Sequence, residues 1–379
     1  MRLDRRRLAA LTAGGVAGAL LGPRWTAEAA ELKVGGEVPL EELPAREASW
    51  YTKLEAKRVE CQLCPQGCKV ADAERGTCGV RENRGGTYYT LVHGVACSVH
   101  VDPIEKKPFF HVMPGEQAFS YATAGCNVEC KFCQNWEISQ FRPEQVKAVY
   151  LPPDALAQFA LRSGARLTAA TYSEPVVFWE YVRDAAQAAR KAGLKPTVVS
   201  NGYIQEQPLK EVLPLLDAVK VDLKSVRDTF YREQVRGTLE PVLKALEVIR
   251  KAGTWLEIVV LVIPTLNDSA EEIRDLARWV KAHLGPDVPV HFTRFHPTYR
   301  LTNLPPTPVA TLERAYQVAR AEGLHFVYLG NVPGHPAENT TCPGCGEVAI
   351  RRLGFQIQTN GLVDGKCKAC GRAIPGVWK

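Results

Sequence analysis

The most informative run in this 379-residue chain is Gly125-Cys126-Asn127-Val128-Glu129-Cys130-Lys131-Phe132-Cys133. Cysteine thiolates are the usual protein ligands of a [4Fe–4S] cluster, which contains four irons. The run offers three thiolates and no fourth cysteine close downstream, so one iron would stay open to a non-protein ligand. The spacing of four and then three residues also fits a buried stripe on a helix. Because Gly125 and Asn127 favour a loop and residues 118–123 favour a strand, we expect a cluster-binding loop at a strand end.

The other cysteines fall mainly into two tight groups of four, which favours metal sites over a disulfide framework. The C-terminal group forms two CxxCG knuckles and consists of Cys342, Cys345, Cys367 and Cys370. Two such knuckles predict a closed zinc site, with two disulfides as the alternative if the chain is exported. The N-terminal group consists of Cys61, Cys64, Cys68 and Cys78. Zinc and a second cluster both fit its spacing, and we favour a structural metal such as zinc. The isolated Cys97 is typical of a small buried apolar residue.

The composition narrows the class of protein. With 46% hydrophobic and 23% charged residues, the chain has the make-up of a globular protein with a sizeable core. Residues 1–29 hold five arginines against one aspartate and one glutamate, so they supply half of the net charge of +6. The rest of the chain is nearly balanced, and we therefore expect no nucleic-acid partner.

The N-terminal 29 residues have the basic, apolar and small-residue regions of a signal peptide. The uncharged stretch from Leu8 to Pro23 is too short to span a bilayer comfortably, so no stable membrane span is expected. The run Arg5-Arg6-Arg7 ahead of it resembles a twin-arginine signal, a route that exports folded proteins. The chain is therefore expected in the periplasm or at the cell surface, with a disordered extension on a cytoplasmic protein as the alternative.

From residue 118 to about 331, strand-like runs alternate with amphipathic helical stretches, a pattern typical of parallel β/α units. Strands are expected over residues 118–123, 167–172, 196–200, 218–223, 256–263, 290–294 and 325–329. Helices are expected over residues 155–161, 176–192, 240–252, 270–284 and 311–322, and a glycine follows each of the last four. Six such units predict an α/β fold with a partial (β/α)₆ TIM-type barrel, whose functional residues lie at the C-terminal strand ends.

The chain divides into five expected parts. These are a twin-arginine-like signal peptide (1–29), a linker (30–55), an N-terminal cysteine-rich module (56–115), the partial barrel (116–335) and a zinc-ribbon-like C-terminal module (336–379).

Polar residues follow four of the expected strands, and they are Ser173, Glu174, Asn201, Asp222, Lys224 and His296. A carboxylate such as Glu174 can accept hydrogen bonds from an ammonium group, or can simply favour the start of a helix. Asp222 and Lys224 alternate with apolar residues where a buried strand ends, which suggests that they reach a ligand at the barrel mouth. His296 is either a polar contact at the site or a buried core histidine.

From about residue 61 to residue 345, the sequence resembles the radical S-adenosylmethionine (SAM) enzyme of the AmmeMemoRadiSam systems, a family similar to pyruvate formate-lyase activating enzymes. Short motifs carry this resemblance in their order along the chain. They are Cys61-Gln62-Leu63-Cys64-Pro65-Gln66-Gly67-Cys68, Cys78-Gly79-Val80-Arg81, Pro103-Ile104-Glu105-Lys106-Lys107-Pro108, the cluster run with Gln134-Asn135-Trp136, Thr171-Tyr172-Ser173-Glu174-Pro175, Asn201-Gly202, Asp222-Leu223-Lys224, Phe295-His296-Pro297 and Gly330-Asn331-Val332-Pro333-Gly334.

The resemblance implies a role for each matching residue. Cys126, Cys130 and Cys133 would bind the cluster, and Phe132 would lie against the adenine of SAM. Ser173 and Glu174 would meet the methionyl amino group. Further SAM contacts would come from Asn201, Asp222, Lys224 and His296. An electron from the reduced cluster would split SAM into methionine and a 5′-deoxyadenosyl radical, which takes hydrogen from a substrate.

The resemblance also implies partners, and the chain differs from glycyl-radical activases at two points. The implied partners are SAM, an undefined substrate, an electron donor such as a ferredoxin or flavodoxin, and Memo-like and Ammecr-like proteins. Glycyl-radical activases commonly carry Asp-Thr before Asn-Gly, whereas this chain has Val199-Ser200. Their additional cysteines tend to follow the cluster loop, whereas here they precede it. Activation of a glycyl-radical protein is thus one alternative, an iron–sulfur electron carrier or sensor without SAM chemistry is a second, and a zinc-stabilised binding module is a third.

Overall fold

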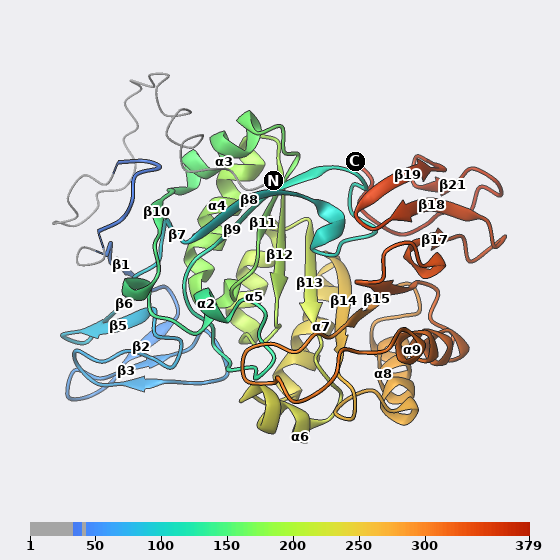
Figure 1. Cartoon of the computed structure of the whole chain (residues 1–379). Helices are drawn as coiled ribbons and strands as arrows, with labels where there is room; N and C mark the ends of the chain where they lie inside the picture. Colours follow the sequence, from blue (N-terminus) through green and yellow to red (C-terminus); the bar gives the residue numbers. More distant parts are fainter. Residues whose placement is uncertain (1–32, 40–42) are drawn as a thin grey trace.

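The computed structural model describes residues 33–39 and 43–379, which form an α/β core with a small module near each end (Figure 1). The expected signal peptide lies outside the described residues. Within the part of the chain that is described, no helix is long and apolar enough to cross a bilayer.

The core is built on a sheet of eight strands within the described residues, in the order β16-β15-β14-β13-β12-β11-β9-β8. Strand β8 (Ser98–Pro103) pairs antiparallel with β9, and every other neighbouring pair is parallel. The parallel strands are β9 (Gln117–Ala122), β11 (Leu167–Ala170), β12 (Lys195–Ser200), β13 (Ala218–Asp222), β14 (Trp255–Val262), β15 (Val290–Arg294) and β16 (Val327–Gly330). Each lies within two residues of its expected bounds, so the α/β class and the parallel sheet are confirmed.

The helices that connect these strands pack along the sheet (Figure 1). They include α3 (Pro153–Arg162), α4 (Trp179–Lys191), α5 (Glu206–Val212), α7 (Glu240–Ala252), α8 (Ala270–His283) and α9 (Val309–Ala321). The expected glycine stops are confirmed, since Gly193 and Gly253 have φ of 78° and 81°, a region that favours glycine. Helix α4 begins later than expected because a 3₁₀ turn (Pro175–Phe178) precedes it. Helix α5 was not predicted, because it is short and contains a proline.

The N-terminal module contains two small antiparallel sheets. One consists of β2 (Tyr51–Lys53), β3 (Val59–Cys61) and β4 (Lys69–Val70), and the other of β1 (Arg46–Glu47), β6 (Thr87–Thr90) and β5 (Arg81–Arg84). A buried ion pair between Arg81 of β5 and Glu180 of α4 joins the module to the core. The backbone N–H of Ser49 also donates to the Glu180 carboxylate at 2.9 Å, which fixes the module on α4.

The C-terminal module packs against the start of β16. It contains β17 (Thr340–Thr341), β18 (Val348–Leu353), β19 (Gln356–Asn360), β20 (Leu362–Val363) and β21 (Lys366–Cys367). Tyr328 of β16 and Phe326 just before it form an apolar cluster with Cys342 and Cys367 of the module. Buried Arg352 donates to the carbonyl oxygen of Phe110 at 2.7 Å, which ties the module to the segment between β8 and β9.

We expect replacement of Arg81 by methionine to lower the free energy of unfolding by about 3–5 kcal/mol, because it leaves the buried Glu180 carboxylate without its counter-charge. Anaerobic urea unfolding of the variant and the parent measures this difference. The double variant R81M/E180L removes both charges and should be closer to the parent than R81M alone. An R81M protein as stable as the parent would show that the pair does not hold the N-terminal module.

Candidate active site

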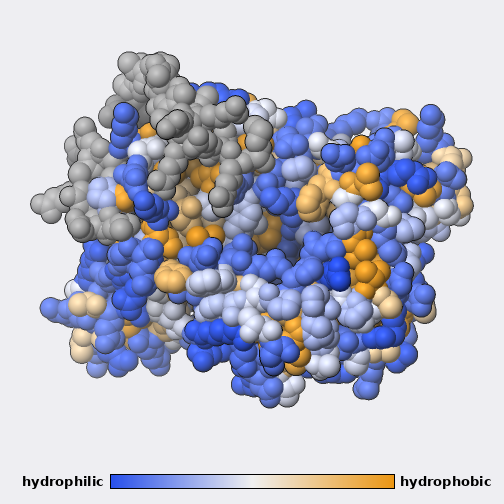
Figure 2. Space-filling view, viewed as in Figure 1, coloured by the Kyte–Doolittle hydropathy of each residue, from blue (hydrophilic) through white to orange (hydrophobic). Residues whose placement is uncertain are grey.

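A cavity of about 420 Å³ opens where the parallel strands end. Figure 2 shows the surface hollowed near the middle of the molecule. Nine of the ten candidate residues line this cavity, and they are Cys126, Cys130, Phe132, Cys133, Ser173, Glu174, Asn201, Asp222 and Lys224. His296 is the exception: it is exposed and does not line the cavity, so it is neither a contact there nor a buried core histidine.

The three cysteines of the central run lie on an irregular loop after β9, and the helical alternative is therefore wrong. Gly125 has φ of 95°, which a residue with a side chain would rarely adopt. The N–H groups of Glu129 and Lys131 donate to the carbonyl oxygens of Val235 and Gln234 at 2.9 and 3.0 Å. These acceptors belong to a π-helical turn (Tyr231–Val235), which the sequence analysis missed and which fixes the loop from outside the sheet.

Of the three cysteines of this loop, Cys130 is buried, and Cys126 and Cys133 are partly buried. Burial raises the pKa of Cys126 and of Cys133, and it raises that of Cys130 to about 11 against the opposing charge of Lys224. Thiols in such surroundings stay protonated near neutral pH unless a metal displaces the proton. The loop thus presents three convergent ligands suited to a soft metal centre.

Glu174 is the most constrained polar group in the cavity. Its carboxylate accepts hydrogen bonds from the Ser200 hydroxyl at 2.6 Å, the Asn201 N–H at 2.8 Å and the Val176 N–H at 3.0 Å. Burial raises the pKa of Glu174 to about 7, and these three donors oppose the shift. A cation next to this carboxylate would stabilise its ionised form.

Asn201 links the end of β12 to the cysteine loop. Its side-chain amide donates to Oδ1 of Asn127 at 2.9 Å, and the Asn127 amide donates to the carbonyl oxygen of Tyr203 at 2.6 Å. The same Asn201 nitrogen lies 3.9 Å from the sulfur of Cys126. The hydroxyl of Ser173 donates to the carbonyl oxygen of Thr123 at 2.6 Å, so both strand-end loops are fixed to the residues around the cluster run.

A line of charges lies at the C-terminal end of β13 and just beyond it. The carboxylate of Asp222 pairs with Lys220, and Lys224 lies 5.7 Å from the ring centre of Phe132. Burial acts to lower the pKa of Lys224, but the nearby Cys130 and Asp222 outweigh it and raise the pKa above its usual value. An aromatic ring and a charged ammonium therefore flank the cysteine loop on one side.

Several residues of the cavity were not singled out from the sequence. Lys107, in a motif quoted only for the resemblance, donates to Asp102 at 2.8 Å, and burial lowers its pKa to about 8. Nε2 of His291 in β15 donates to the Glu257 carboxylate at 2.7 Å, while its buried Nδ1 has no hydrogen-bond partner among the described residues. Lys220 and His291 are also polar residues in buried strands. The criterion that selected Asp222, a charged residue among apolar ones at a buried strand end, could therefore have identified them.

The C-terminal cysteines form a compact group. The four sulfur atoms lie within 4.8 Å of one another. Separations of 3.6 Å for Cys342–Cys370 and 3.8 Å for Cys345–Cys367 are far beyond the ~2.05 Å of a disulfide, so the disulfide alternative is wrong. This group could hold one metal ion.

The N-terminal cysteines surround a different, smaller cavity, which Cys61, Cys64, Cys68 and Cys78 all line. The cavity lies between the module and the core, because Val176 and Val177 of the core also line it.

Comparison with known proteins now defines the class. Residues 120–280 match the radical SAM superfamily. An uncharacterized protein of Methanocaldococcus jannaschii is 43% identical over 331 residues, which cover 87% of this chain and 98% of that protein. The chain therefore belongs to the radical SAM superfamily and shares a family with this archaeal protein, and membership implies SAM and a [4Fe–4S] cluster.

A more distant sequence relative agrees with this assignment. The pyruvate formate-lyase 1-activating enzyme of Escherichia coli is 24% identical over 217 residues, which cover 52% of this chain and 87% of that enzyme. A radical SAM methyltransferase from Sphaerobacter thermophilus has a TM-score of 0.46 at 17% identity, and the match covers 57% of this chain and 67% of that structure. The chain is thus homologous to pyruvate formate-lyase activating enzymes.

The raised pKa of Glu174 predicts a pH dependence of stability. An unfolded glutamate has a pKa of about 4.3, so the folded state binds this proton more tightly. The stabilisation that the protonated Glu174 gives to the folded state is therefore fully present below about pH 4.3, and it is lost as the pH rises through about 7. Between pH 6 and pH 8 we expect the free energy of unfolding of the SAM-free protein to fall by about 1–2 kcal/mol more than that of E174Q.

Urea unfolding at the two pH values measures this difference, with the exposed Glu240→Gln as the matched control. An E174Q variant with the same pH dependence as the parent and the control would contradict the assignment.

Proposed function

We propose that this protein cleaves SAM reductively to a 5′-deoxyadenosyl radical and uses that radical to abstract hydrogen from a substrate that the sequence does not name. The observation that carries the proposal is the convergence of nine separately predicted residues on one cavity at the strand ends. An electron carrier or sensor needs only the cysteines, and it does not account for the polar residues that follow three further strands.

The residues present fit the implied cluster. Cys126, Cys130 and Cys133 converge on one cavity from a single fixed loop. When bound, the cluster supplies the open iron for SAM and the electron that breaks its carbon–sulfur bond. Phe132 beside Lys224 offers an aromatic face for the adenine.

Glu174 would act as the acceptor for the methionyl ammonium. Its three donors hold the carboxylate in one orientation before SAM arrives, and the ammonium would favour the ionised form. Ser173 and Asn201 would line the same end of SAM, and Asp222 would meet a polar part of it. The surrounding strands exclude water from the radical.

We further propose that the seven parallel strands act as a partial (β/α)₆ barrel within residues 116–335, with a cysteine-rich module at 56–115, whose last strand β8 joins the edge of the sheet, and a zinc-ribbon-like module at 336–379. The order of motifs supports the radical SAM enzyme of an AmmeMemoRadiSam system, with Memo-like and Ammecr-like proteins as partners and a ferredoxin or flavodoxin as electron donor. Export through the arginine-rich residues 1–29 belongs to the same proposal, and a cytoplasmic location is its alternative. The linker expected at residues 30–55 is shorter than expected, because β1 and β2 pair with strands of the N-terminal module.

Activation of a glycyl-radical protein is a second candidate, favoured by the relatives that are named activating enzymes. Val199 argues against activation of a glycyl-radical protein, because it lines the cavity at the position where those enzymes commonly carry an aspartate. Ser200, the next residue, is engaged with Glu174 at 2.6 Å.

Loss of one cluster ligand tests the proposed activity. The Cys126→Ala variant, supplied anaerobically with iron, sulfide, dithionite and SAM, should form 5′-deoxyadenosine at least about 100-fold more slowly than the parent, because the variant cannot hold the cluster. Chromatography measures the product. Cys97→Ala is the matched control, since Cys97 lines neither cavity described above, and it should keep the parent rate. Equal product from Cys126→Ala and the parent would overturn the proposal.

The C-terminal cysteines should hold one zinc ion per chain, because four sulfurs at this separation match tetrahedral coordination. We expect Cys367→Ser to lose this zinc and to unfold at lower temperature, since Cys367 also packs against Tyr328 and Phe110. Elemental analysis checks the metal, with Cys97→Ser as the control that retains it. Iron in place of zinc at these cysteines would contradict the assignment.

A further inference from the structure

The N-terminal cysteines converge although they come from separate segments. Cys61 ends β3, Cys64 and Cys68 lie in the turn that follows, and Cys78 precedes β5. All four line one small cavity with Arg81, Tyr88 and Asn127. Such convergence indicates a shared ligand rather than four independent core residues.

The separation of the sulfurs distinguishes the two ligand classes. Tetrahedral zinc with Zn–S bonds of about 2.3 Å holds its sulfurs roughly 3.8 Å apart. In a [4Fe–4S] cluster each thiolate binds a different iron, so the sulfurs lie farther apart. Among the described residues, only the C-terminal cysteines form a group whose ligand atoms all lie within 4.8 Å. No three sulfurs of the N-terminal cysteines, and not the three of the SAM site, meet this limit, so both sets are more widely spaced than the zinc-type group.

The ligand environment also suits a cluster. The backbone N–H and the hydroxyl of Thr77 lie 3.4 and 3.3 Å from the sulfur of Cys68. Hydrogen bonds to the sulfurs, together with burial, tune the reduction potential of iron–sulfur clusters. Cys61 and Cys64 are buried, whereas Cys68 and Cys78 are partly exposed, so one side of the site is close to solvent.

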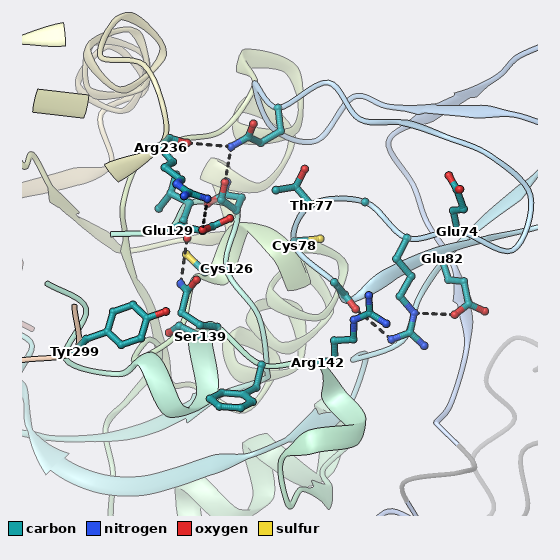
Figure 3. A pocket seen from close by; sticks show the side chains of 18 of the residues that line it. Glu74, Thr77, Cys78, Glu82, Cys126, Glu129, Ser139, Arg142, Arg236 and Tyr299 are labelled. Carbon is teal, nitrogen blue, oxygen red and sulfur yellow. Dashed lines mark hydrogen bonds and ion pairs between the residues drawn. The ribbon is translucent and has the colours of Figure 1, made fainter. Parts of the chain in front are cut away.

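The two iron-type ligand sets adjoin each other. Cys126 lies on the wall between the SAM cavity and a larger cavity of about 990 Å³, and Cys78 lines that larger cavity too (Figure 3). The side chain of Gln66 donates to the carbonyl oxygen of Asn127 at 2.8 Å. A Cβ on Gly125 would lie 2.9 Å from the carbonyl oxygen of Cys78, so the two ligand loops are in direct backbone contact.

We propose that Cys61, Cys64, Cys68 and Cys78 bind a second [4Fe–4S] cluster, which passes single electrons to the cluster of the SAM site. The wide sulfur arrangement replaces our initial preference for zinc at these cysteines. The electron-passing role rests on the proposed function, whereas the identity of the metal does not.

An external protein reductant supplies the electron for each SAM that is cleaved. An external low-potential iron–sulfur protein or flavoprotein gives one electron to the second cluster, which changes from the 2+ to the 1+ state. That cluster returns to 2+ when the electron moves on to the SAM site, where it is consumed in breaking the carbon–sulfur bond of SAM. The donor is oxidised by one electron for each SAM cleaved.

Iron content tests the site directly. The full chain with Cys126, Cys130 and Cys133 all replaced by alanine, reconstituted anaerobically with iron and sulfide, should retain about four irons and one zinc. Its reduced EPR spectrum should be unaffected by SAM. A variant that holds two zincs and no iron would overturn the proposal. This readout is independent of 5′-deoxyadenosine, so a failure of the proposed function would leave it unchanged.

If the triple variant does not fold, the iron content of the parent protein still tests the second cluster. Mössbauer spectra of the ⁵⁷Fe-reconstituted parent should show about eight irons in two [4Fe–4S] clusters, as should the Cys97→Ala control. About four irons per chain in the parent would overturn the second cluster.

The relay is tested with two reductants. With a reduced flavodoxin as donor, Cys68→Ala should form 5′-deoxyadenosine about tenfold more slowly than the parent. With dithionite, which can reach the SAM site directly, the two rates should agree within about twofold. An equal loss of rate with both reductants would show a structural role and contradict the relay.

Discussion

The parallel direction of the strands is the constraint on which this site depends. Because β9 and β11 to β15 all run the same way, the residues that follow them meet at one edge of the sheet. The cysteine loop, Glu174, Asn201 and Asp222 are thereby brought together from segments almost 100 residues apart. The hydrogen bonds from Ser200 and Asn201 to Glu174 then fix two neighbouring strand ends in one register. The cysteine modules add to this arrangement, one on α4 and the other on β16.

Local signals made most of the fold predictable. The strands are short apolar runs between turn residues, and the glycines after the helices adopt the positive φ that ends a helix. The elements that were not predicted from the sequence lack such local signals. The π-helical turn Tyr231–Val235 is held by the cysteine loop, and α5 is too short to show a periodic pattern. The order of strands beyond the parallel units, including the antiparallel β8, also required the structure.

The candidate site was predictable where a charge or a thiol stood in an unusual local context. Cys126, Glu174 and Asp222 are of this kind, and all line the cavity. The prediction for His296 was wrong because, after β15 ends, Phe295 is buried and His296 is exposed to solvent. Thr293 of β15 lines the cavity instead. Lys107 was not predictable as a cavity residue, because only the docking of the segment after β8 brings it there. Cysteine spacing alone also left the N-terminal metal open, since the separation of sulfurs is a property of the folded chain.

The central claim is that one iron lacks a protein ligand and is held by SAM. Electron–nuclear double resonance of the reduced protein with SAM labelled with ¹⁵N in its amino group tests this directly. Coordination through that group predicts a hyperfine coupling between the labelled nitrogen and the cluster of the SAM site, and the coupling should disappear in E174Q if that carboxylate positions the ammonium. A reduced spectrum that SAM leaves unchanged, with no nitrogen coupling, would contradict the account.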